Sequence, residues 1–176
     1  TQIIDKADYA RRSSKQLKNS HTYTIYSDQM EAKQGQYAYL RSHIPHAFKN
    51  HEIVILYQPK YDLLTERMIG AEALVRWKDP KGTLLLPEVF LPILQQERLL
   101  ADLDFYIIEE VCKRLKSLKE KGKRIYPVSI HLSVAHLQTK DFMKRFIGIV
   151  EQYKIPISYL NLEIDEKCFY DEPDTM

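Results

Sequence analysis

The sequence has few glycines and cysteines, no long apolar run and almost no net charge. Its 176 residues include 5 Gly and 2 Cys, and the cysteines form no Cys-x-x-Cys pair. This argues against a Gly-rich phosphate loop and against a zinc module. No apolar run approaches the ~18 residues of a membrane helix, so we expect no membrane segment. With 26 Lys+Arg against 24 Asp+Glu, we expect no basic face for duplex DNA or RNA.

What is present is the composition of a folded globular domain. Hydrophobic residues make up 44% and charged residues 28% of the chain, which excludes a disordered or collagen-like protein. The two thiols, Cys112 and Cys168, suit a reducing cytoplasm, and we expect both to be buried in the core. The chain begins with Thr1 and has no signal-peptide pattern, which suggests an excised piece of a longer protein.

The first 50 residues are predicted to form two helices separated by a strand. Apolar residues at helical spacing, with acidic residues early and basic residues late, predict a helix over residues 2–18. The β-branched and aromatic run at 21–26 predicts a strand. A second helix is expected over roughly 29–49, kinked or interrupted by Pro45.

From residue 51 onward, the sequence predicts strands that alternate with helices. The strands are 53–58, 68–77, 126–132 and 159–164; a turn or hairpin covers 60–67; the helices begin at Leu86-Pro87 and cover 102–118 and 141–153. This alternation indicates parallel βαβ units of an α/β fold, and four such units are half of an eight-stranded barrel. The sheet is therefore open, or the chain is incomplete. The unpaired edges of a half barrel favour a homodimer.

Polar side chains occur in or just after these strands, where ligands bind in parallel α/β folds. They are Gln58, Glu72, Arg76, His131, Glu163 and Glu166. Carboxylates suit Mg²⁺ and Mn²⁺, and imidazole suits transition ions, so a Glu–His–Glu set could hold a divalent cation. Other interpretations stay open: Glu72 and Arg76 could form a structural ion pair, and His131 could be a hydrogen-bonded core residue. Glu163 and Glu166 are three residues apart, so on an extended strand they point to opposite faces and share one face only if the chain bends between them.

Four ordered segments after residue 50 carry the motifs of one known family. They are Tyr57-Gln58-Pro59 with Gly70-Ala71-Glu72-Ala73-Leu74-Val75-Arg76-Trp77, then Leu86-Pro87-Glu88-Val89-Phe90-Leu91-Pro92, Val128-Ser129-Ile130-His131-Leu132-Ser133 and Leu160-Asn161-Leu162-Glu163-Ile164-Asp165-Glu166. Together they resemble the EAL domain of bacterial cyclic-di-GMP phosphodiesterases, which is named after the motif at Glu72-Ala73-Leu74.

The resemblance implies a fold, an activity and a set of site residues. It implies a (β/α)8 TIM-like barrel, with its N-terminal half in residues 51–176, that hydrolyses cyclic-di-GMP to linear pGpG with Mg²⁺ or Mn²⁺. By position, it implies metal ligands at Glu72, His131 and Glu163, catalytic roles for Glu72 and Glu166, and substrate contacts from Gln58, Leu74 and Arg76.

The N-terminal residues carry a second likeness. Ile4-Asp5-Lys6-Ala7-Asp8-Tyr9-Ala10 and Tyr23-Thr24-Ile25-Tyr26 are similar to the final helix and strand of a GGDEF (diguanylate cyclase) domain. Residues 1–28 would then be its C-terminal remnant, and residues 29–50 a linker helix. The signature loop of that domain is absent, so no cyclase activity is expected.

Two departures from the family pattern bear on activity. His131 stands where the family usually has Asn, and an imidazole is larger and softer than an amide oxygen, which would weaken Mg²⁺ most. The family's later metal ligands lie beyond Met176. We therefore expect little or no hydrolysis by this chain. The alternative is a catalytically degenerate EAL module that acts as a cyclic-di-GMP receptor or binds a partner protein.

Overall fold

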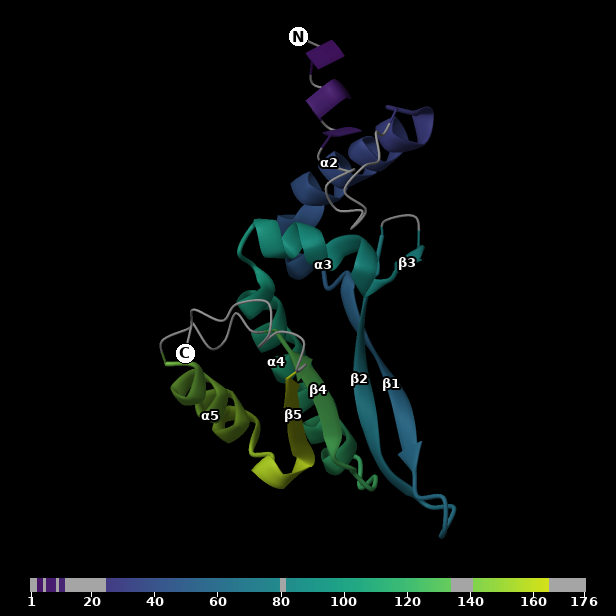
Figure 1. Ribbon diagram of the computed structural model, residues 1–176. Helices are drawn as coiled ribbons and strands as arrows, with labels where there is room; N and C mark the ends of the chain where they lie inside the picture. The colour runs from purple at the N-terminus through teal and green to yellow at the C-terminus, as the bar shows by residue number, and fades with distance from the viewer. Residues whose placement is uncertain are drawn as a thin grey trace. The chain divides into compact units, whose positions relative to one another are not determined.

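The computed structural model describes most of the chain in two compact units. The units are Thr1–Pro45 and His46–Met176 (Figure 1). The described residues are 3–4, 6–8, 10–11, 25–79, 82–133 and 141–164.

The first unit is helical where it is described. Residues 3–4, 6–8, 10 and 11 are helical, and helix α2 (Asp28–Lys49) begins in this unit. Helix α2 runs through Pro45, so of the predicted kink or interruption the interruption is wrong. The proline removes one backbone hydrogen bond, and the buried Ile44 and Ala47 flank it. Ile25 and Tyr26 are not in a strand, contrary to prediction, and residues 21–24 lie outside the described part.

The second unit is built on a mixed sheet of five strands. They are β1 (Ile53–Tyr61), β2 (Met68–Lys78), β3 (Leu84–Leu85), β4 (Val128–Leu132) and β5 (Leu160–Ile164). The order is β1-β2-β4-β5, with β3 paired to β2. Strands β2, β4 and β5 are parallel, as expected, but β1 is antiparallel to β2. The parallel βαβ interpretation is therefore wrong for β1, whereas the turn or hairpin predicted at 60–67 agrees with the antiparallel pair. The short segment 62–67 can close a hairpin but cannot make a parallel crossover.

Three helices accompany the sheet, as predicted. Helix α3 (Pro87–Gln96) begins with proline in its first turn, α4 (Leu100–Glu120) precedes Gly122, and α5 (Phe142–Tyr153) leads through a 3₁₀ turn (Ile157–Tyr159) to β5. Gly122 has φ +65°, a conformation that glycine adopts without strain. Proline suits the start of α3 because its missing N–H would be unpaired there anyway.

The core lies between the sheet and helices α3 and α4. The indole of Trp77 on β2 meets Phe90 of α3 edge-on, with ring centroids 5.9 Å apart. On β4, Val128, Ile130 and Leu132 are buried. Because successive strand residues point to opposite sides, the residues between them face away from this core. The largest fully buried side chains are Trp77, Phe90, Phe105, Ile93, Leu94, Leu103, Ile108, Ile130, Val111 and Cys112.

The composition led us to expect buried cysteines and no membrane segment. Cys112 is a buried free thiol, and burial raises its pKa to about 11; Cys168 lies outside the described residues. Within the described part of the chain, no helix is long and apolar enough to cross a membrane.

Candidate functional site

The strand register gathers the predicted polar residues on one face of the sheet. Gln58 of β1 pairs with Glu72 of β2, which in turn pairs with Ser129 of β4. Two residues further along, His131 of β4 pairs with Glu163 of β5. Directly paired residues point to the same side of a sheet, so all five side chains share the face opposite the helix-covered core.

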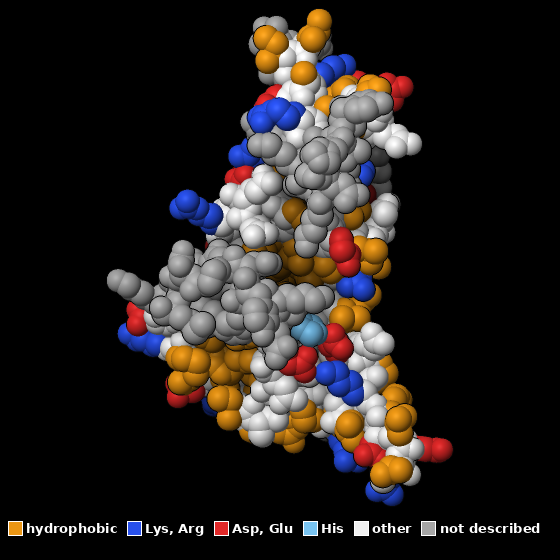
Figure 2. Space-filling model, viewed as in Figure 1, with side chains coloured by type: hydrophobic (Ala, Val, Ile, Leu, Met, Phe, Trp, Pro, Cys, Tyr) orange, Lys and Arg blue, Asp and Glu red, His pale blue; other side chains and the backbone are white. Residues whose placement is uncertain are grey.

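Three of these side chains meet. The Nε2 atom of His131 lies 2.8 Å from Oε1 of Glu72 and 3.6 Å from Oε2 of Glu163. We call Glu72, His131 and Glu163 the acid–imidazole cluster. Figure 2 shows a histidine beside acidic and basic side chains on the visible surface over the sheet. The cluster is open to solvent on this face, since the His131 side chain is 56% exposed.

A fourth residue, Lys60, joins the cluster and was missed by sequence reasoning. Because β1 extends to Tyr61, Lys60 is a strand residue rather than part of the predicted turn. Its Nζ atom donates hydrogen bonds to Ser129 Oγ at 2.8 Å and Glu163 Oε1 at 3.3 Å. A hydrogen bond from Ser129, followed by the bond and charge of Lys60, lowers the pKa of Glu163. The available signal was spacing: Lys60 is two residues after Gln58, on the same face of the strand.

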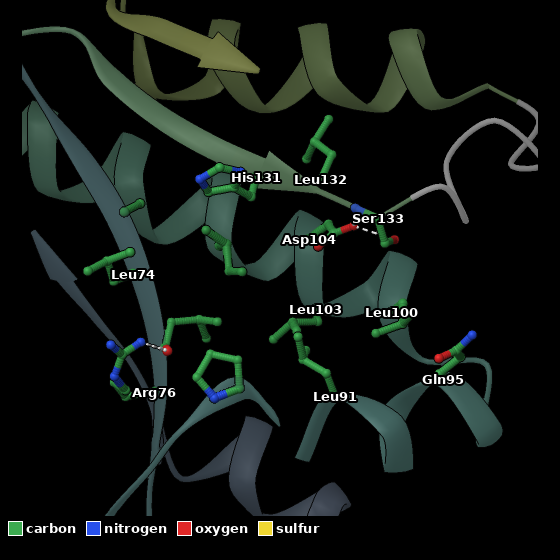
Figure 3. A pocket seen from close by; sticks show the side chains of 14 residues that line it. Leu74, Arg76, Leu91, Gln95, Leu100, Leu103, Asp104, His131, Leu132 and Ser133 are labelled. Carbon is green, nitrogen blue, oxygen red and sulfur yellow. Dashed lines mark hydrogen bonds between the residues drawn. The ribbon is translucent and has the colours of Figure 1, made fainter. Parts of the chain in front are cut away.

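Leu74 and Arg76 occupy the same strand as Glu72, nearer its C-terminal end. Figure 3 shows both on one side of β2, with Leu91 and Leu103 of the helices on the other. The Arg76 guanidinium donates to the carbonyl oxygen of its neighbour Val75 at 2.7 Å. Among the described residues it forms no ion pair with Glu72, so the structural pair considered from the sequence is not formed.

A cavity of about 350 Å³ adjoins this end of the sheet. Its lining comes from β2, β4, α3 and α4 and is mostly apolar: Ala73, Leu74, Val75, Arg76, Pro87, Leu91, Gln95, Leu100, Leu103, Asp104, Ile107, His131, Leu132 and Ser133. The cavity therefore lies at the end of β2 and β4, and Arg76 and His131 are among the polar residues of its mostly apolar lining.

Asp104 on α4 is a second residue that sequence reasoning missed. It is only 4% exposed, and its Oδ2 accepts hydrogen bonds from the backbone N–H of Ser133 at 2.8 Å and from its hydroxyl at 2.7 Å (Figure 3). Ser133 follows His131 by two residues, so the buried carboxylate fixes the chain where β4 ends. The sequence did hold a signal for its burial: Asp104 lies four and seven residues before the buried Ile108 and Val111, and therefore on the same face of the helix.

The acid–imidazole cluster does not form a divalent-cation site as it is arranged. Its donor types suit Mn²⁺ or Mg²⁺. However, the imidazole is engaged with Glu72, and the ammonium of Lys60 is engaged with Glu163. No group of three or more His, Cys, Asp or Glu in the described ranges has the geometry of a metal site. Glu166, the remaining predicted catalytic residue, lies outside the described residues.

Comparison with known proteins identifies the family. The sequence model of the EAL domain matches residues 41–176, so the chain belongs to the EAL domain family. It is 29% identical over 170 residues to signaling protein YkoW of Bacillus subtilis, covering 97% of this chain and 21% of that protein. It is 24% identical over 174 residues to cyclic di-GMP phosphodiesterase PdeR of Escherichia coli, covering 99% of this chain and 26% of that protein. The chain thus spans about a quarter of the length of these relatives.

Solved structures agree on the fold. A structure titled PaMucR phosphodiesterase, c-di-GMP complex, matches with a TM-score of 0.69 and 24% identity, covering 77% of this chain and 55% of that chain. The FimX EAL domain of Xanthomonas citri, in complex with c-diGMP, matches with a TM-score of 0.69 and 14% identity, covering 82% and 56%. At these identities the likeness supports the fold alone: a mixed α/β arrangement that matches EAL barrel structures, here as a partial, open sheet.

Proposed function

We propose that this chain carries the cyclic-di-GMP-binding face of an EAL domain. The observation that carries the proposal is the register, which aligns Gln58 and Glu72 in one row and His131 and Glu163 in the next. Membership of the EAL family supports the choice of ligand. In this proposal the sheet is part of a (β/α)8 barrel, and the polar face is its interior.

The roles of the side chains follow from their chemistry. The planar guanidinium of Arg76 binds a phosphate of the dinucleotide through two parallel hydrogen bonds. Leu74 packs against a nucleoside, beside the apolar cavity, and Gln58 donates or accepts a hydrogen bond from the neighbouring strand. Arg76 suits this role because its hydrogen bond to the Val75 carbonyl holds the guanidinium in place and uses only part of its donor capacity.

The binding experiment is a titration of the protein with cyclic-di-GMP by isothermal calorimetry in EDTA. We expect saturable binding, and an Arg76→Ala variant should lose about 10- to 100-fold in affinity, as for a charged hydrogen bond worth about 1.5–3 kcal/mol. Arg11→Ala removes the same charge from an exposed pair with Asp8 and should leave binding unchanged. Absence of saturable binding, or equal losses in both variants, would contradict the proposal.

Hydrolysis is the second candidate, favoured by the donor types of the acid–imidazole cluster. In it, Glu72, His131 and Glu163 hold Mg²⁺ or Mn²⁺, and Glu72 and Glu166 act in catalysis. Because the cluster residues are engaged with one another and with Lys60, we propose little or no hydrolysis by this chain. Chromatography of the products with Mn²⁺ present tests this: accumulation of linear pGpG at the rate of an active phosphodiesterase would overturn it.

Several wider assignments stay proposals. Residues 1–28 are proposed as the end of a GGDEF domain, residues 29–50 as the linker helix and the cytoplasm as the location. A homodimer, or binding of a partner protein, is proposed from the edges of the partial sheet. Analytical ultracentrifugation tests the dimer, and a monomer at all concentrations would contradict it.

A further inference from the structure

Lys60 brings a positive charge into the acid–imidazole cluster from three strands away. The sheet order is β1-β2-β4-β5, so the side chain of Lys60 on β1 must cross β2 to reach Ser129 on β4 and Glu163 on β5. Its Nζ atom makes both contacts, at 2.8 Å and 3.3 Å. A lysine that reaches across a sheet to two polar partners gives up side-chain freedom, so the contacts must offset that entropy.

Gly70 explains how Lys60 can make this crossing. Lys60 pairs with Gly70 on β2, and side chains of paired residues point to the same side of the sheet. Because Gly70 has no side chain, β2 presents no side chain at the position that pairs with Lys60. A Cβ atom added at Gly70 would also lie 3.0 Å from the carbonyl oxygen of Pro127, closer than ordinary van der Waals contact.

The negative charge of the site is then partly offset within the protein. Two carboxylates, Glu72 and Glu163, face each other across the imidazole of His131, which lies 2.8 Å and 3.6 Å from them. Like charges this close repel unless a cation lies near. The ammonium of Lys60 supplies that cation at Glu163, the position at which a divalent ion would otherwise be attracted.

We propose that Lys60 is an internal counter-ion of the acid–imidazole cluster, which holds Glu163 in place and weakens the binding of divalent cations there. Lys60 acts through Glu163 and is a positioning residue. The inference rests on the proposed function only in placing ligand binding at this face. It explains why the donors are suitable in type yet do not form a metal site.

The test is a titration of the protein with Mn²⁺ alone, without nucleotide, in which electron paramagnetic resonance measures free Mn²⁺. We expect weak binding by the wild-type protein and about tenfold tighter binding by Lys60→Met, because a positive charge near the ion is removed. Lys60→Arg retains the charge and should bind like wild type. Lys60→Gln also loses the charge but keeps a hydrogen-bond donor. It should bind Mn²⁺ about tenfold more tightly than wild type as well, and it replaces Lys60→Met in the test if that variant folds poorly.

Lys113→Met is the matched control. Lys113 is 42% exposed, close to the 39% of Lys60, and it is paired with Glu110 at 2.8 Å and Glu109 at 3.4 Å outside the cluster. The Lys113→Met variant removes the same charge and should leave the Mn²⁺ affinity unchanged. Equal affinities in wild type and both neutral Lys60 variants, or no Mn²⁺ binding in any of the proteins, would overturn the proposal.

The outcome is separable from that of the proposed function. A tighter Mn²⁺ site in Lys60→Met, in a protein that does not bind cyclic-di-GMP, supports the counter-ion and contradicts only the nucleotide site. Saturable cyclic-di-GMP binding in EDTA, with no effect of the Lys60 variants on Mn²⁺, contradicts only the counter-ion.

Discussion

Replacement of Asp104 by Ala should destabilise the protein more than any nearby surface substitution. The carboxylate is 4% exposed, and one oxygen accepts two hydrogen bonds from Ser133, at 2.8 Å and 2.7 Å. Hydrogen bonds to a charged group contribute about 1.5–3 kcal/mol, and their loss leaves the Ser133 amide without this acceptor. Since both bonds share one oxygen, we expect Asp104→Ala to lower the free energy of unfolding by about 2–4 kcal/mol.

The assay is urea unfolding followed by the fluorescence of Trp77. This is the chain's single tryptophan, and its side chain is fully buried between the sheet and α3, so its emission should change when the core opens. Ser133→Ala removes only the hydroxyl bond and should cost about 1 kcal/mol. The double variant with Asp104→Ala should cost less than the sum of the single changes, because the two residues share an interaction.

The matched control is Asp102→Ala on the same helix. Asp102 is exposed and lies 3.9 Å from Arg145, and such a surface pair contributes about 0–1 kcal/mol. If Asp104→Ala is no more destabilising than Asp102→Ala, then the carboxylate does not anchor the end of β4 as argued.

Three further outcomes are expected. Phe90→Ala removes a fully buried ring that packs on Trp77 and should cost about 3–5 kcal/mol in urea unfolding; a cost below about 1 kcal/mol would contradict the packing. Because the pKa of Glu163 is lowered in the folded protein, its ionised carboxylate stabilises the fold. This stabilisation is present at pH values above the ordinary carboxyl range and is lost as the pH falls through the lowered pKa. Carboxyl titration by NMR should therefore show a higher Glu163 pKa in Lys60→Met than in wild type, and an unchanged pKa would contradict the contact. Cys112, buried with a pKa of about 11, should resist thiol reagents until urea unfolds the chain, which peptide mass spectrometry can measure; rapid labelling of the native protein would contradict its burial.

The alternation of apolar and polar residues predicted most of the elements but not the direction of β1. The pattern gave helices α3, α4 and α5 and the parallel strands, because burial of one face imposes a period on the sequence. It left open whether residues 60–67 form a turn or a hairpin. In the structure Asp62 Oδ1 accepts hydrogen bonds from the backbone N–H groups of Leu64 and Thr65, and this local turn reverses the chain.

Side chains that act across the fold could be named but not placed from the sequence. Glu72, His131 and Glu163 were singled out as polar residues in apolar strands, and the structure brings them together because β4 lies between β2 and β5. Lys60 and Asp104 were overlooked because their partners, Glu163 and Ser133, are 103 and 29 residues away. A local sequence pattern cannot show a contact between residues so far apart in the chain. Such contacts form only once the strand order and the helix packing are fixed.

The position of His131 is therefore set by its neighbours more than by its own contacts. On β4, Val128, Ile130 and Leu132 are 3%, 0% and 6% exposed. Burying an aliphatic side chain of this size contributes about 1.5–3 kcal/mol. A register slip of one residue would move all three side chains off the core face and turn His131 toward the core. One of them would take the buried position of Ser129, so the cost comes from the other two and is about 3 kcal/mol or more. The hydrogen bond between His131 and Glu72 contributes less than this, so the hydrophobic face of β4 forces the imidazole onto the polar face, and the cluster forms because the core does.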